Sequence, residues 1–258
     1  MYLIYRYGEA IECYQEALIC LEKDDPLVYT TMISVLEKMG FIFNIQHQYD
    51  EALNAQRRAL QIRNENKPID HLMIAKNLKE IGNILFKQED YDDALNYYQQ
   101  ALTIFEEKYP KNHIEITNCL REIGLAWNSK TDYDRAAEYF EKCLHIIEAS
   151  VSLADPMISD IILYLSLVEE KRNHRELSLA HEINYCLICL KFRPLDQRPI
   201  GYSFSRIGQH YEHLNKPILA IDYYRQALTI FQNCLPEWHE SRIDMELKLE
   251  RLSKETIM

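Results

Sequence analysis

Apolar residues recur at every third or fourth position along most of the chain, which is the spacing of one face of an α-helix. Between Ile69 and Lys87 the apolar positions include Leu72, Ile74, Ala75, Leu78, Ile81 and Leu85. Between Tyr91 and Lys108 they include Ala94, Leu95, Tyr98, Ala101, Leu102 and Phe105. A short polar stretch, residues 88–90, separates the two runs. The pattern predicts an amphipathic helix A and an amphipathic helix B joined by a tight turn.

This pair of helices is repeated along the chain at a fixed spacing of 42 residues. The period is marked by tyrosine at Tyr7, Tyr49, Tyr91 and Tyr133, by glycine at Gly40, Gly82, Gly124 and Gly208, and by proline at Pro26, Pro68, Pro110, Pro194 and Pro236. The strings NYYQQALTIF (96–105) and DYYRQALTIF (222–231) lie three periods apart. A period of this length, kept without insertions, is typical of repeats that stack on their neighbours.

The phase of the period predicts an all-α solenoid of antiparallel helix pairs with defined boundaries. The five full repeats are residues 27–68, 69–110, 111–152, 153–194 and 195–236. Residues 1–26 are a partial repeat, the end of one helix A followed by its helix B, and residues 237–258 are a capping helix with Leu247, Leu249 and Leu252 among many charges. The incomplete start has two explanations, a chain that begins late in a longer product or a half-repeat that serves as an N-terminal cap.

The small residues of the period predict how helices A and B pack. Gly82 lies inside helix A, where glycine costs about 1 kcal/mol against alanine, so close packing must offset it. We expect Gly82, Ala94 and Ala101 to let the two helices approach, and the ring of Tyr98 to fill the space beside them. The recurring proline is expected to stop one helix and open the next.

The fourth repeat, 153–194, departs from this pattern. Glu169 and Glu182 stand where other repeats have large apolar or aromatic residues, and Tyr185 replaces a small one. Because a buried unpaired carboxylate is costly, we expect this repeat to pack differently. A hinge and a drifted but regular repeat are the two alternatives.

Charge and composition narrow the class of protein. A net charge of −11 and a pI near 5.3 argue against nucleic acid and against an anionic membrane surface as partners. The longest apolar run, residues 158–168, is far shorter than a membrane span, and no secretory signal is visible. Seven scattered cysteines in a chain of 258 residues favour a reduced, cytoplasmic protein.

Sites for catalysis, cofactors or metals find no support in the sequence. It has no glycine-rich phosphate loop, GxSxG or HExxH motif, so we expect no enzyme activity and no cofactor. His210, Glu212 and His213 lack the further ligands of a zinc site, and Cys186 and Cys189 fit helix packing better than metal or redox chemistry. His71 and His113 follow the recurring proline in phase and are expected to cap or pack at the turn between repeats.

The positions Leu78, Ile81, Gly82, Leu85, Ala94, Tyr98 and Ala101 together resemble the tetratricopeptide repeat, a helix–turn–helix unit. The 42-residue length and the Pro-x-x-His entry, at residues 68–71, 110–113 and 236–239, are similar to the kinesin light chain type. The resemblance covers essentially the whole chain. It implies a right-handed superhelix whose A helices line a concave groove, and a function in binding peptides or partner proteins.

The groove that the resemblance implies gives a set of candidate binding residues on the exposed face of the A helices. They are Lys76, Lys79, Asn83, Lys87, Asn118, Arg121, Leu125, Asn128, Leu163, Leu167 and Tyr202. Basic and amide side chains beside an apolar strip fit an acidic peptide with hydrophobic anchors. The alternative interpretation is that these are ordinary solvated helix residues.

Departures from known groove types limit what the resemblance carries over. A chaperone clamp for a C-terminal carboxylate would need basic or amide residues at Glu122, Asp160 and Tyr164, so the clamp is absent. Kinesin light chains have asparagine at the position of Glu37, Lys79, Arg121, Leu163 and Ser205, so the motor-adaptor role does not transfer. The sequence therefore predicts a binding scaffold for a protein or peptide that it does not identify. The alternative is the recruitment or regulatory region of a larger enzyme or signalling protein.

Overall fold

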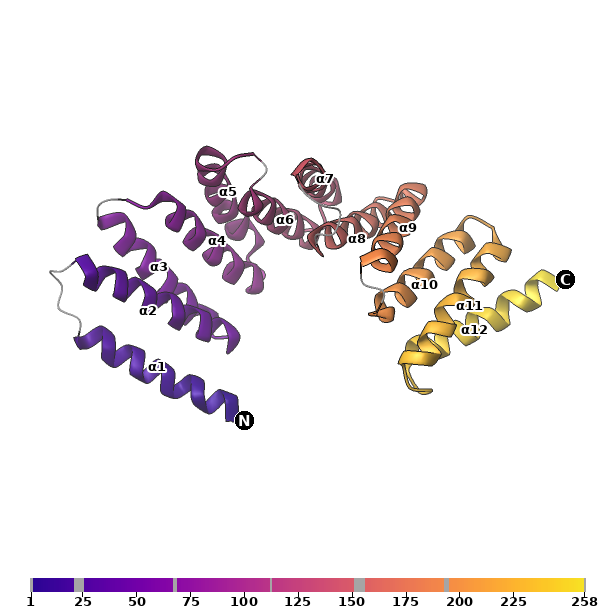
Figure 1. The fold of residues 1–258 in the computed structure, drawn as a ribbon, viewed down its shortest axis with the longest axis horizontal. Helices are drawn as coiled ribbons and strands as arrows, with labels where there is room; N and C mark the ends of the chain where they lie inside the picture. Colours follow the sequence, from indigo (N-terminus) through magenta and orange to yellow (C-terminus); the bar gives the residue numbers. More distant parts are fainter. Residues whose placement is uncertain are drawn as a thin grey trace. The chain divides into compact units, whose positions relative to one another are not determined.

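The computed structural model describes residues 2–20, 26–66, 69–111, 113–150, 156–192 and 195–257, and every regular element in these ranges is an α-helix (Figure 1). The chain forms two compact units, 1–132 and 133–258. The N-terminal unit contains α1 (Tyr2–Cys20), α2 (Pro26–Ile45), α3 (Tyr49–Glu65), α4 (His71–Lys87), α5 (Tyr91–Lys108) and α6 (Ile114–Ser129). The C-terminal unit contains α7 (Tyr133–Ser150), α8 (Pro156–Lys171), α9 (Arg175–Phe192), α10 (Gln197–His213), α11 (Pro217–Cys234) and α12 (Glu240–Ile257). The all-α prediction is confirmed.

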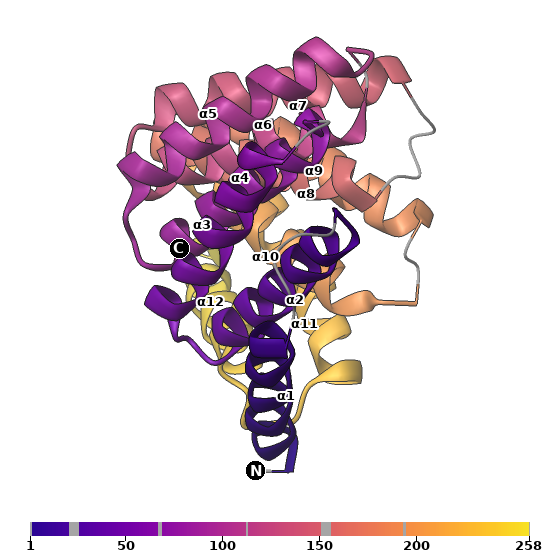
Figure 2. The same ribbon diagram turned by 90° about the vertical axis from the view of Figure 1, so that its left-hand side faces the viewer.

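Within each unit, helices that follow one another in the chain pack together. In the N-terminal unit α2 packs on α3, α4 packs on α5, and α3 joins the two pairs by contacting α4. Figure 2 shows α1 alongside α2 in the same unit. In the C-terminal unit the pairs are α8 with α9 and α10 with α11, followed by α12 on α11. The helices α2, α4, α6, α8 and α10 have the role of helix A, and α3, α5, α7, α9 and α11 have that of helix B.

Every described turn from helix A to helix B has the same backbone geometry. Glu89 follows α4 in the left-handed region, with φ of 66°. Its N–H donates to the carbonyl of Phe86, and the N–H of Asp90 donates to the carbonyl of Leu85. These two bonds are those of a Schellman motif, which satisfies the last carbonyls of a helix. A residue in this left-handed conformation recurs every 42 positions, at His47, Glu89, Thr131, Asn173 and Asn215.

The first helix differs from the expectation. The structure shows one continuous α1 from Tyr2 to Cys20, where the sequence suggested the end of a helix A, a turn and a helix B. In the described turns of the other repeats the equivalent position adopts positive φ, whereas α1 continues through it as a helix.

The glycine of helix A packs against the aromatic ring of helix B, as predicted. A Cβ on Gly82 would lie 2.6 Å from Cε1 of Tyr98, and one on Gly208 would lie 2.6 Å from the Tyr224 ring. Both rings, and Ala101 beside the first crossing, are fully buried. The absence of a side chain at the glycine is therefore what lets the ring lie on the backbone of the partner helix.

The entry to helix A is only partly as predicted. His113 caps α6, because its Nδ1 accepts from the N–H of Glu115 at 3.2 Å, and His239 accepts in the same way at α12. At α4 the cap is Asp70, whose Oδ1 accepts from Met73, and not His71. Pro110 and Pro236 lie in the turn, three residues before the capping histidine, instead of in the first turn of the next helix. Pro68 and Pro194 lie outside the described residues.

The fourth repeat keeps the regular arrangement of helices. The carboxylate of Glu169 is fully buried, but it is paired with Arg172 at 2.6 Å and with His174 Nδ1 at 2.7 Å. The Glu169 carboxylate is therefore not left unpaired, because Arg172 and His174 bond to it. The packing differs at Glu182, where no aromatic ring lies against helix A. At the C-terminus, Leu252 is buried and Leu249 packs on the same core, whereas Leu247 is exposed.

We predict that Gly82→Ala lowers the free energy of unfolding by about 1–3 kcal/mol, because the new methyl group overlaps the fully buried Tyr98 ring. Gly8→Ala is the matched control, since a Cβ there meets no atom within 4 Å and alanine favours the helix. Urea denaturation followed by circular dichroism measures both. Equal midpoints for the two variants would contradict the assigned contact.

Candidate partner-binding clefts

Two clefts open between consecutive A helices, one in each compact unit. The first cleft, of about 160 Å³, lies between α2 and α4 and is lined by Glu37, Gly40, Phe41, Asn44, Gln56, Lys76, Asn77, Glu80 and Ile84. The second cleft, of about 460 Å³, is lined by Leu163, Glu182, Tyr185, Asp196, Arg198, Pro199, Tyr202, Ser203, Arg206, Leu235 and His239. The second cleft has the volume of a pocket for a large side chain or a short peptide segment.

The two clefts occupy equivalent positions in the repeat. Five lining positions of the first cleft are found again in the second, 126 residues further on: Glu37 and Leu163, Gln56 and Glu182, Lys76 and Tyr202, Asn77 and Ser203, and Glu80 and Arg206. Gln56 and Glu182 stand at the helix B position that carries the buried ring of Tyr98 in the second repeat. Both clefts therefore open where a polar side chain replaces an aromatic ring.

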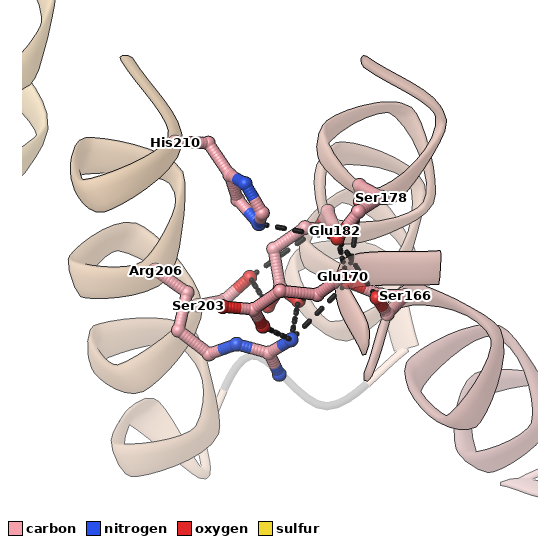
Figure 3. Close-up of polar contacts among 7 residues, drawn as sticks. All are labelled: Ser166, Glu170, Ser178, Glu182, Ser203, Arg206 and His210. Carbon is pink, nitrogen blue, oxygen red and sulfur yellow. Dashed lines mark hydrogen bonds and ion pairs between the residues drawn. The ribbon is translucent and has the colours of Figure 1, made fainter. Parts of the chain in front are cut away.

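The floor of the second cleft is a network of buried polar groups (Figure 3). Glu182, from α9, is fully buried, and its two carboxylate oxygens accept from Ser203 at 2.8 Å and Ser166 at 2.9 Å. Arg206 reaches from α10, with Nη2 3.1 Å from Glu182 and 3.8 Å from Glu170. Arg206 thus compensates the charge of Glu182, and two hydroxyl groups donate hydrogen bonds to its oxygens.

The network extends to the helix A position that is glycine in the other repeats. Ser166 stands there, and the Ser178 hydroxyl donates to the backbone carbonyl of Ser166 at 2.8 Å. The Ser166 hydroxyl lies 3.1 Å from the Ser178 carbonyl, but its single proton goes to the charged Glu182. His210 Nε2 lies 3.3 Å from the Ser178 hydroxyl. Burial lowers the pKa of His210, and the charges of Arg206, His213 and Arg175 act in the same direction against Glu170. The neutral imidazole is therefore the form that fits this core.

The first cleft has a neutral floor. Asn77 donates from Nδ2 to Oε1 of Gln56 at 2.5 Å, and both side chains are buried. Glu37 at the rim is bound by Arg63 at 2.5 Å. Phe41 is 63% exposed, so an aromatic face is open to solvent at this cleft.

The cations predicted for the A-helix face lie close to carboxylates of the same unit. Lys79 Nζ is 2.6 Å from Glu115, and Arg121 is 2.6 Å from Glu122. Burial alone would raise the pKa of Glu115, but the hydrogen bond and charge of Lys79, with the charge of Lys76 and a hydrogen bond from Asn118, lower it overall. The patch is therefore less basic than the lysines and arginine alone suggested.

Other predicted residues of the N-terminal unit have varied surroundings. Lys87 donates to the amide oxygen of Asn44 at 2.9 Å, and Lys76 lines the first cleft. Asn83 accepts from the hydroxyl of Tyr98 at 3.0 Å, so its amide oxygen supports the core. Leu125 and Asn128 are half-buried on α6.

The predicted residues of the C-terminal unit lie at or near the second cleft. Leu163 and Tyr202 line it, and Leu167 follows one turn later on α8 with 39% of its surface exposed. The sequence prediction missed Arg206 and Ser203 as members of this site. Glu182 was noticed, but only as a packing problem, because its partners lie in the next repeat.

The histidine and cysteine motifs have structural roles. Glu212, between His210 and His213, accepts from the Tyr224 hydroxyl at 2.9 Å and pairs with Arg251 at 2.6 Å. Within the described residues, no three histidine, cysteine or carboxylate side chains are grouped as metal ligands would be. Cys186 and Cys189 are buried in α9, and burial raises the pKa of the Cys186 thiol to about 11. They act as packing residues.

The stacked helix pairs and the clefts between their A helices define an α-solenoid repeat protein. Models of the tetratricopeptide repeat match residues 31–107, 72–149 and 202–234, which together exceed half of the chain. The chain belongs to the tetratricopeptide-repeat family. Repeats of this family generally serve as protein–protein interaction scaffolds.

Solved structures with the same fold include repeats of the predicted type. BtubC (BKLC) from P. vanneervenii matches with a TM-score of 0.74 and 13% identity over 92% of each chain. A putative kinesin light chain with nearly identical TPR-like repeats from Podosopora anserina matches with a TM-score of 0.61 and 14% identity, over 72% of this chain and 87% of that one. The apo form of RapI matches with a TM-score of 0.63 and 17% identity, over 96% of this chain and 72% of that one.

A search of curated proteins finds no match. Among the described residues, no helix combines the length and the apolar character needed to cross a bilayer.

We predict that Arg206→Met lowers the free energy of unfolding by about 3 kcal/mol, because it leaves the Glu182 carboxylate buried without its cation. Combining it with Glu182→Gln removes both charges and should restore most of the stability. Urea denaturation of the two variants measures the difference. If the double variant is no more stable than Arg206→Met, the ion pair is not what stabilises the floor.

We predict that stability falls below about pH 6.5, the ordinary histidine pKa. The folded protein holds His210 at a lower pKa, so the unfolded chain binds the proton more readily. The stabilisation is complete above the unfolded pKa and is lost as the pH falls through the folded one. Burial lowers the pKa of His181 in the same way. His210→Gln should reduce the change in thermal midpoint between pH 7.5 and pH 5.5, whereas the exposed control His71→Gln should leave it as in the wild type.

Proposed function

We propose that this scaffold binds a partner protein through an extended or helical segment of that partner, which lies along the exposed faces of the A helices. The observation that carries the proposal is the equivalence of the two clefts. Each opens between consecutive A helices, and each is bordered by a large, solvent-exposed ring, Phe41 or Tyr202. Exposed aromatic side chains beside a cleft are typical anchors for a bound segment.

The proposed segment is acidic and carries hydrophobic anchors. Among the cations of the predicted face, Lys79 and Arg121 are held in ion pairs, so they contribute little attraction to a ligand. Lys76 and Lys87 form no ion pair with a carboxylate in the described part of the chain. These two ammonium groups are therefore the ones that would attract acidic side chains of a partner.

Selection from a phage-displayed library of random peptides tests this proposal with the full chain. We expect enrichment of peptides that combine Asp or Glu with Leu, Phe or Tyr. Lys76→Glu combined with Lys87→Glu should weaken their binding by about tenfold or more, because two attractive charges become repulsive. Fluorescence anisotropy with the selected peptides measures the change.

The matched control is Arg57→Glu combined with Lys108→Glu, which changes the net charge equally at exposed positions of B helices. Binding should stay at the wild-type level in this variant. Peptides that lack acidic residues, or equal affinity for the two charge-reversed variants, would contradict the acidic segment.

A further inference from the structure

The charges around the second cleft cancel. Glu182 is sealed in the floor by Ser166, Ser203 and Arg206, and its carboxylate has no exposed surface. At the rim, Arg198 lies 3.9 Å from Asp196. His239 uses Nδ1 to cap α12. A charged side chain of a ligand would therefore lose its hydration on entering the cleft, and it would find no opposite charge that is not already paired.

The uncharged surface of the second cleft is largely apolar. Leu163, Pro199 and Leu235 form parts of its wall, and Tyr202 and Tyr185 add two aromatic rings. Tyr202 is 43% exposed and packs at 5.0 Å, between ring centroids, on the buried Phe231. The wall is thus a fixed apolar surface that remains partly wet, and an apolar side chain would displace that water.

Hydrogen-bond donors remain at one side of the second cleft. Arg206 makes its contacts to Glu182, Glu170 and Ser166 through Nη2 (Figure 3). Its Nε and Nη1 groups have no acceptor within the described ranges of the chain. Because the charge of Arg206 is already compensated, a neutral carbonyl oxygen suits these donors as well as a carboxylate does.

We propose that the second cleft is a socket for one uncharged, apolar side chain of the partner segment, such as leucine or phenylalanine. The main-chain carbonyl next to that side chain accepts from Arg206. This inference rests on the proposed function and adds the chemistry of one contact to it. It assigns a salt-insensitive contact to the second cleft.

The test uses the full chain and the peptides selected from the phage-displayed library. Leu163→Trp fills the second cleft and should weaken binding by about tenfold, whereas Leu187→Trp, an exposed leucine on α9, should not change it. The ratio of wild-type to Leu163→Trp affinity should be the same in about 0.05 M and about 0.5 M salt, because the ligand group in the second cleft carries no charge. Tyr202→Ala, which removes an exposed wall residue, should also weaken binding and serves if Leu163→Trp does not fold.

Each other result overturns the inference. Wild-type affinity in both cleft variants, with weaker binding on reversal of Lys76 and Lys87, would leave the proposed function intact and remove the socket. A cleft contribution that disappears in high salt, or that requires Asp or Glu in the peptide, would show that Arg206 binds an anion. A selection that enriches no peptide would overturn both the socket and the proposed function.

Discussion

The contact on which this structure depends is that of an aromatic ring on helix B with a glycine on helix A. Tyr98 lies on Gly82, and its hydroxyl reaches the amide of Asn83, so the ring is buried and its polar end is bonded. Tyr224 repeats the arrangement on Gly208. The contact closes each of these helix pairs, and a helix pair cannot bury its apolar face alone, so the pairs stack on their neighbours.

Where the ring is lost, its partners change with it. In the fourth repeat Glu182 replaces the ring and Ser166 replaces the glycine, and the two side chains are hydrogen bonded at 2.9 Å. A side chain at the glycine position is tolerated there because no ring opposes it. In the first repeat the glycine is kept, and Gln56 bonds instead to Asn77 on the next helix A. The arrangements around Glu182 and Gln56 differ in charge, but each lies beside a cleft between A helices.

The fold could be predicted from the sequence because its determinants are local and periodic. The limits of α4 and α5 follow from apolar spacing and a three-residue turn, and the pairing of Gly82 with Tyr98 follows from their fixed distance in the repeat. The clefts could not be predicted, because they depend on contacts between repeats. Lys79 meets Glu115 on the next helix A, and Arg206 meets Glu182 one repeat earlier. The conformation of the turn residues could not be predicted for another reason. Glu89 and Thr131 adopt positive φ, and the glycine that normally signals a left-handed residue is absent there.

A cleft opened by a polar substitution differs from one opened by a smaller apolar residue. An apolar vacancy is reduced when its neighbours relax into it, and its cost grows with the volume that remains. In the second cleft the walls are held by hydrogen bonds from Ser203 and Ser166 to one buried carboxylate, so closing the space would break them. The same bonds occupy the carboxylate oxygens of Glu182, so the surface that faces the opening is apolar. The departure from the repeat therefore keeps the cleft open and also restricts what can enter it, and residues that pack identically in every repeat can do neither.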